Sequence, residues 1–223
     1  MIELRAVTAG GFHEASLVVN PGESCRLLLA AETDLALFLG LLAGTARPLR
    51  GAVLLFGREI SDLPEPEALA LLARLGLVWP GGGFISNLKT WENILLPLWY
   101  HGDGRAGGRE AEVVELLGRI GVATDRVPDF LGALPGTLPA REQRLLGVAR
   151  AMMQDAEVMI YAELLAGLDE ATRTRLLAET ERHQARRPGR AALYLSTSAQ
   201  GLPEAGGRRS LRQEPGGGIV PWP

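Results

Sequence analysis

The stretch that decides the fold is CRLLLAAETDLALFLGLLAG, residues Cys25–Gly44. Its start, Cys25–Leu29, is an apolar run typical of a strand buried on both faces. Its end, Leu37–Gly44, predicts an apolar helix. The sequence GAVLLFGREI at Gly51–Ile60 then predicts a strand, a turn and a second strand. We therefore expect a strand, a connecting loop and a helix, the repeating unit of α/β folds.

The residues from Leu29 to Ala36 stand where nucleotide-binding proteins carry the phosphate-binding motif G-x-x-x-x-G-K-[S/T]. Both glycines, the lysine and the hydroxyl residue of that motif are absent. Leu35 takes the lysine position and Ala36 the magnesium-ligand position, while Glu32 and Asp34 add negative charge. At about 4 Å and an effective dielectric near 20, one like-charge contact costs roughly 4 kcal/mol. We therefore expect no ATP or magnesium cofactor.

Five segments resemble, in order and spacing, those of the ATP-binding subunit of an ABC transporter, over about Met1 to Val220. They are LLAG followed by GAVLLFGREI, RLGLVWPGGGFISNLKTWENILLPL at Arg74–Leu98, LPAREQRLLGVARAMM at Leu138–Met153, EVMIYAELLAGLDEATR at Glu157–Arg173 and ALYLSTSAQ at Ala192–Gln200. An ordinary α/β domain that matches by chance is the competing interpretation, and five matches in family order speak against it. The sequence of Ile85–His101, ISNLKTWENILLPLWYH, resembles the corresponding segment of ATPases that work with MCE-domain proteins in phospholipid transport across bacterial envelopes.

The resemblance implies that most nucleotide-site positions are altered. Pro80 stands in the Q-loop glutamine position, Ala162 in the Walker B aspartate position and Ser198 in the switch histidine position. The Walker B glutamate is kept as Glu163, which is either a residual general base or, more simply, a cap or ion-pair member. Phe12 is the one candidate for the adenine-stacking aromatic.

The signature motif of the family, LSGGQ, is also replaced. Its positions hold Leu138, Pro139, Ala140, Arg141 and Glu142. Pro139 and Ala140 remove donors and flexibility, and Glu142 adds repulsion, so the resemblance implies an impaired composite site with a partner subunit as well. The D-loop keeps Leu168 and Asp169, and Asp169 also predicts the N-cap of the following helix.

The predicted fold is α/β and P-loop NTPase-like, as in ABC ATPases, with a mixed-sheet core, an antiparallel β portion and an inserted helical subdomain. One domain is expected over 1–223. Residues 1–88 and 154–200 would form the RecA-like core with its β portion, and 89–153 the helical subdomain. We expect an irregular tail over 201–223, because its many Gly, Pro and Arg residues show no periodicity.

Bulk composition limits the classes of function and partner that the chain can have. At 223 residues and 47% hydrophobic, the chain can bury a substantial core. Its net charge of −3 argues against a nucleic-acid partner. The single cysteine, Cys25, excludes a disulfide framework and fits a reducing cytoplasm. The three histidines, His13, His101 and His183, are too widely separated to predict a metal site. No run approaches the ~18 apolar residues of a membrane span.

The function expected from the resemblance is a catalytically inactive nucleotide-binding subunit at the cytoplasmic face of the inner membrane. Its partners would be an integral membrane permease, a second ABC ATPase subunit, identical or different, and an MCE-domain protein. The predicted permease contacts are Gly82, Phe84, Asn87, Trp91 and Leu95. Phe84, Trp91 and Trp99 are equally well read as core residues. A weakly active ATPase that uses Glu163 and a soluble scaffold or regulator are the alternatives.

Overall fold

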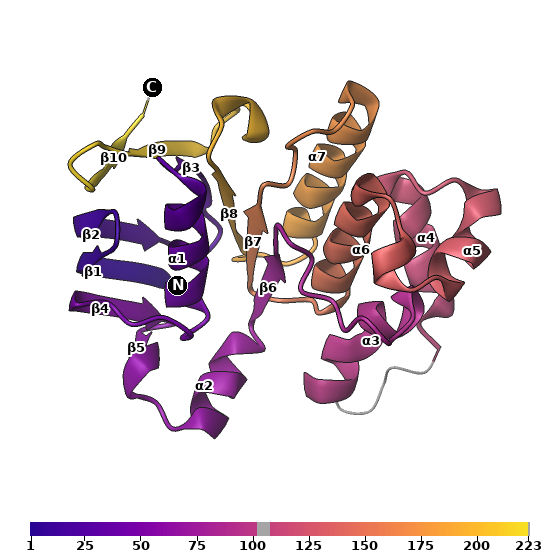
Figure 1. Cartoon of the computed structure of the whole chain (residues 1–223), viewed down its shortest axis with the longest axis horizontal. Coiled ribbons are helices and arrows are strands. Elements are labelled where there is room, and N and C mark those ends of the chain that lie inside the picture. The colour runs from indigo at the N-terminus through magenta and orange to yellow at the C-terminus, as the bar shows by residue number, and fades with distance from the viewer. Residues whose placement is uncertain (102–107, 223) are drawn as a thin grey trace.

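The computed structural model describes residues 1–101 and 108–222, apart from the side chain of His101 (Figure 1). The Gly-rich stretch 101–108 predicts a hinge before the next helix, and most of it lies outside the described residues. The strands are β1 (Ile2–Ala9), β2 (Phe12–Val19), β3 (Ser24–Leu28), β4 (Arg50–Leu55), β5 (Arg58–Glu59), β6 (Leu75–Val78), β7 (Val158–Ala162), β8 (Ala191–Ser196), β9 (Arg209–Gln213) and β10 (Ile219–Pro221). The α-helices are α1 (Glu32–Leu42), α2 (Glu65–Leu72), α3 (Thr90–His101), α4 (Glu110–Ile120), α5 (Val127–Gly132), α6 (Ala140–Met153) and α7 (Glu170–Ala185).

The strands form two sheets, and the expected mixture of parallel and antiparallel pairing is confirmed. One sheet is antiparallel in the order β2-β1-β4-β5. The other has the order β10-β9-β3-β8-β7-β6, and its strands are parallel except for β10. The carboxyl ends of β3, β7 and β8 therefore meet at one edge of the central sheet, where ligands of open α/β sheets bind.

The central sheet is covered on both faces, and alternate residues of each strand serve different cores (Figure 1). Along β7, Val158 and Ile160 pack with α1 and the antiparallel sheet. Met159 and Tyr161 pack on the opposite face with α3 to α7. Phe12 belongs to the first core: it is fully buried, with its ring 5.9 Å from that of Phe38. The proposal that Phe12 stacks on an adenine is therefore wrong.

The carboxyl-terminal segment is ordered, which corrects the irregular tail expected over 201–223. Strand β9 pairs in parallel with β3, and β10 returns beside it. Leu211 and Gln213 point inward at 5% and 8% exposure, while Arg212 between them is exposed. This period of two was hidden because only two inward residues carry it. Gly217, with φ of +85°, forms the turn to β10.

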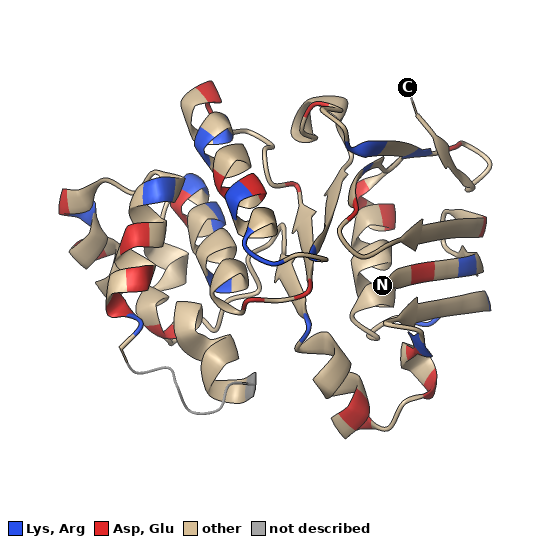
Figure 2. Cartoon of the chain, turned by 180° about the vertical axis from the view of Figure 1, so that it is seen from behind, with Lys and Arg blue, Asp and Glu red and all other residues tan. Residues whose placement is uncertain are grey.

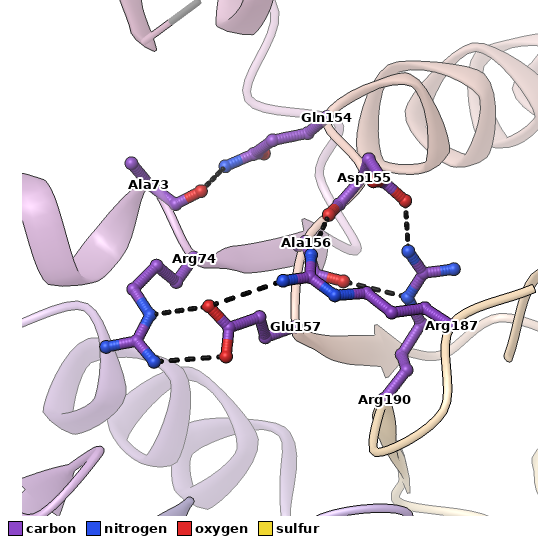
Figure 3. Close-up of polar contacts among 8 residues, drawn as sticks. All are labelled: Ala73, Arg74, Gln154, Asp155, Ala156, Glu157, Arg187 and Arg190. Atoms are coloured by element: carbon purple, nitrogen blue, oxygen red, sulfur yellow. Dashed lines mark hydrogen bonds and ion pairs between the residues drawn. The ribbon is translucent and has the colours of Figure 1, made fainter.

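A polar network secures the opposite, amino-terminal edge of the central sheet (Figure 3). The guanidinium of Arg190 is fully buried and donates to the carbonyl of Ala156 at 2.8 Å, to the carbonyl of His183 and to the Asp155 carboxylate. Glu157 accepts two bonds from Arg74, at 2.8 and 3.0 Å. These contacts tie β6, β7 and the turn before β8 together.

Helix α7 carries both acidic and basic side chains, whereas α3 carries a single charged residue, Glu92 (Figure 2). Helix α4 has three acidic residues and one basic residue, Glu110, Glu112, Glu115 and Arg119. Trp99 on α3 is 48% exposed and Tyr100 is 81% exposed. None of the described helices is both long enough and apolar enough to span a bilayer.

Candidate functional site

The connection between β3 and α1 is much shorter than a phosphate-binding loop. Helix α1 begins at Glu32, not at Leu37 as expected, so that only Leu29, Ala30 and Ala31 lie between strand and helix. Glu32 and Asp34 fall in the first helical turn, where acidic side chains are favoured by the helix dipole. Because no glycine interrupts this turn, the residues fold as helix and leave no amide cradle for a phosphate.

Asp34 points away from the nucleotide position, which corrects the expectation that it repels phosphates there. Its carboxylate is 9% exposed and accepts a hydrogen bond of 3.1 Å from Gln213 Nε2. The same amide nitrogen donates to the Gly11 carbonyl at 2.9 Å, and Gln213 Oε1 accepts from the Ala30 amide at 2.9 Å. Gln213 thus accepts a hydrogen bond from a backbone amide of the short loop between β3 and α1. Sequence reasoning missed it because it lies in the segment expected to be irregular.

A cavity of about 360 Å³ lies between α1, the segment after β6 and the end of β7. Its lining residues are Glu32, Leu35, Ala36, Leu39, Trp79, Pro80, Gly81 and Glu163. The structure thus brings together Leu35, Ala36 and Pro80, which the resemblance assigns to the lysine, magnesium-ligand and glutamine positions. The buried side chains of Leu29 and Ala162 lie in the core instead, and Ala162 is not among the residues that line the cavity.

Glu163 is held by hydrogen bonds from the strand beside it. Its Oε2 accepts from Ser196 Oγ at 2.9 Å. Its Oε1 accepts from the amide and hydroxyl of Thr197 at 2.7 and 3.1 Å. Its backbone is left-handed, with φ of +50°, an uncommon conformation for a residue other than glycine. The neighbouring Ser198, in the switch position, is exposed, and its amide donates to Ser196 Oγ at 3.1 Å.

A guanidinium faces the backbone of Glu163 from the helical side. Arg144 on α6 donates to the carbonyls of Glu163 and, at 2.9 Å, of Ala166. Burial lowers the pKa of the Arg144 guanidinium, and the charge of Glu163 opposes that shift. Arg144 lines a separate small cavity of about 80 Å³ and not the cavity beside α1.

The signature positions form a tightly bonded helix start. Pro139 caps α6 and Ala140 is its first residue, so no side chain offers a donor there. Arg141 Nε donates to Thr172 Oγ1 at 3.1 Å, and its Nη2 donates to the Gly121 carbonyl at 3.2 Å. Leu138 is buried in the helical core. Glu142 is paired with Arg126 at 3.3 Å, which offsets part of the repulsion expected from it.

The D-loop residues are tied to the same helices. Asp169 is the N-cap of α7, as predicted, and accepts from the Thr172 amide at 2.9 Å and hydroxyl at 2.7 Å. These two bonds hold the pKa of the Asp169 carboxyl below its usual value. Leu168 packs against the helical core. Both side chains thus have structural partners.

The predicted permease contacts do not form one exposed surface, because some of them are buried. Leu95 is buried at 2% exposure, so a partner cannot reach it, which corrects that assignment. Gly82 is buried as well, and its carbonyl accepts from Arg150 Nη2 at 2.7 Å. Phe84 and Trp91 are half-buried against the helical core, and Asn87 is exposed. The helical period explains the error, because Trp91 and Leu95 share the inward face of α3.

An apolar groove lies on the other face of α3. It has a volume of about 310 Å³ and is lined by Leu69, Leu72, Leu75, Leu77, Leu96, Pro97, Tyr100, Arg150 and Gln154. Leu69 and Tyr100 at its rim are 48% and 81% exposed. Within the described part of the chain, no group of three or more His, Cys, Asp or Glu side chains could hold a metal ion.

Comparison with known proteins identifies the architecture. The solved dimeric bacterial ABC transporter cassette MJ0796 is 19% identical, with a TM-score of 0.83 over 98% of this chain and 96% of that one. The chain has the ABC ATPase cassette fold. No protein-family model matches it.

Curated relatives agree with the cassette fold. The methionine import ATP-binding protein MetN 1 of Rhodococcus jostii (strain RHA1) is 29% identical over 190 residues, 80% of this chain and 54% of the relative. The macrolide export ATP-binding/permease protein MacB of Rhodopseudomonas palustris (strain HaA2) is 29% identical over 172 residues, 76% of this chain and 25% of the relative. The chain therefore spans about half or less of these relatives. Relatives and solved structures thus point to the same architecture, that of the ABC transporter ATP-binding cassettes.

Proposed function

We propose that this cassette is a catalytically inactive nucleotide-binding subunit of a bacterial membrane transporter. It fills one ATPase position beside a second ABC ATPase subunit and couples to an integral membrane permease at the cytoplasmic face of the inner membrane. The observation that carries the proposal is the cavity beside α1. Leu35 and Ala36 line it, and none of its lining residues is basic.

Inactivity follows from what nucleotide hydrolysis requires. Phosphates need cations or backbone amides around them, and a metal needs an oxygen ligand. The loop amide of Ala30 already donates to Gln213, and the Walker B aspartate position is the methyl group of Ala162. The carboxylate of Glu163 accepts three hydrogen bonds, which leaves it poorly placed to take a proton from water.

Calorimetry with magnesium and ATP at millimolar concentration tests inactivity. We expect no saturable heat and no release of phosphate by the purified chain. Binding below about 1 mM, the range of functional nucleotide sites, contradicts the proposal. Hydrolysis that is lost in Glu163→Gln but kept in the exposed control Glu170→Gln would establish the alternative, a weakly active ATPase.

The apolar groove beside α3 is the proposed permease site. Its walls are leucines of α2 and β6 together with Leu96 and Pro97 of α3, so a helix of the permease could bury an apolar face there. MacB carries the ATP-binding and permease functions in its name, which shows that related cassettes work with permeases. Leu69→Asp at the rim should abolish co-purification with a permease from detergent extracts. Leu49→Asp, at a position 83% exposed and outside the groove, should leave it unchanged.

Phospholipid transport with an MCE-domain protein is the proposed context, supported by the resemblance of Ile85–His101. The co-purified complex should contain a multi-span permease, an MCE-domain protein and a second ABC ATPase. A complex with a solute permease and no MCE-domain protein contradicts the lipid assignment alone. Recovery of the chain without any permease favours a soluble scaffold or regulator.

A further inference from the structure

The cavity beside α1 has lost its fit to phosphates and gained the features of a different binding site. We propose that it binds a small organic cation, an ammonium group on an apolar stem. This inference rests on the proposed function only in that nucleotide must leave the cavity free.

The walls suit an apolar stem. Leu35, Ala36, Leu39 and Pro80 supply aliphatic surface, and Trp79 adds an indole ring that is half-buried at the cavity wall. A volume of about 360 Å³ is at the lower end of the range typical of small-molecule sites. An aromatic face with aliphatic neighbours attracts an organic cation more than a hydrated inorganic ion, because the stem is desolvated favourably.

The charge of the cavity is set by Glu32. Among the described residues, Glu32 has no hydrogen-bond or ion-pair partner, and it lies exposed at the cavity. The second lining carboxylate, Glu163, has its oxygens occupied by Ser196 and Thr197 and a guanidinium, Arg144, bonded to its carbonyl. Glu163 is therefore compensated, whereas Glu32 is not.

The amino end of α1 does not reverse this balance. A helix amino terminus carries about half a positive charge, which is less than the full negative charge of the Glu32 side chain in the same turn. Asp34, the other acid of that turn, is turned toward Gln213. An anion would meet Glu32 without any cation in the lining, and a neutral ligand would leave the Glu32 carboxylate unused.

Choline and its neutral carbon analogue, 3,3-dimethylbutan-1-ol, form a matched pair of probes for calorimetry on the full chain. Choline should bind saturably, and the neutral analogue about fivefold more weakly, since an exposed ion pair is worth up to about 1 kcal/mol. Glu32→Gln should weaken choline binding by about the same factor. Glu110→Gln, which removes the equivalent first-turn acid of α4, should leave it unchanged.

Equal binding of the two probes, no saturable binding of choline, or an unchanged affinity in Glu32→Gln would overturn the inference. Trp79→Leu provides a second variant at the cavity wall and should also weaken choline binding, because the cation loses its aromatic neighbour. A parallel titration with magnesium and ATP separates the two claims. Nucleotide binding refutes the proposed inactivity. If neither choline nor nucleotide gives saturable heat, only the cation site is refuted.

Discussion

The hydrogen bonds of Gln213 offer the sharpest test of what holds the short loop between β3 and α1 in place. Gln213→Leu keeps the size of the side chain approximately and removes every polar contact. Three groups then lose their partner: the Ala30 amide, the Gly11 carbonyl and the Asp34 carboxylate. The first two lie on exposed residues, so water can replace Gln213 there, whereas Asp34 is 9% exposed.

The expected cost follows from these three bonds. A hydrogen bond to a charged group contributes about 2 kcal/mol, and the two exposed bonds together add about 1 kcal/mol. We therefore expect Gln213→Leu to lower the free energy of unfolding by about 3 kcal/mol. For a chain of this length, 1 kcal/mol corresponds to roughly 3 °C in Tm, so Tm should fall by about 10 °C.

Urea unfolding followed by circular dichroism measures the change. Gln200→Leu is the control, since Gln200 is exposed and its side chain makes no hydrogen bond among the described residues. Gln154→Leu loses one bond of 2.8 Å, to the Ala73 carbonyl, and should cost about 1 kcal/mol. The reasoning is refuted if Gln213→Leu equals Gln200→Leu within error. In a double-mutant cycle, Asp34→Leu should recover part of the loss, because the buried charge goes with its partner.

Three further results are expected. His183 has a pKa lowered to about 4 by burial first and then by the charge of Arg190. The unfolded state binds this proton more readily than the folded state does. The stability that neutral His183 contributes is therefore fully present above pH 6.5 and is lost as pH falls toward 4, by about 3 kcal/mol in total. In His183→Gln, the free energy of unfolding should fall less steeply over this acid range. Burial raises the pKa of the Cys25 thiol to about 11, so native protein should resist a thiol reagent that labels the urea-unfolded chain at once. Arg190→Met leaves the Ala156 and His183 carbonyls without their donor and should cost about 3 kcal/mol in urea unfolding, whereas exposed Arg186→Met should cost little.

The sheet and the helices were predictable because their patterns are local. The runs at Cys25–Leu29 and Ala192–Ser196 correspond to β3 and β8. Every residue of β8 is buried, whereas alternate residues of β3 are only partly buried. The side chains of β9 give much weaker evidence: two inward residues among arginines and glycines do not show a period of two. Its partner β3 lies more than 180 residues earlier, and such a pairing leaves no mark on local sequence.

The candidate site was likewise predictable from the sequence only in part. The identities at Leu35, Ala36 and Pro80 were enough to predict a cavity without a phosphate cradle, and these residues do line one. Directions of side chains were not predictable. Asp34 and Leu95 both turned inward, because one meets Gln213 from the distant β9 and the other faces the helical core.

These inward contacts also limit what the cavity beside α1 can offer a ligand. Three polar groups near the candidate site are bonded within the chain: Gln213 bonds the Ala30 amide, Ser196 and Thr197 bond the Glu163 carboxylate, and Thr172 bonds the Asp169 carboxylate. A ligand of the cavity would have to break those bonds, at about 1 kcal/mol or more each, or bind without them. Glu32 and Trp79 are the lining groups that a ligand can use at no such cost. Any affinity the cavity retains should therefore depend on these two side chains and not on the positions inherited from the nucleotide site.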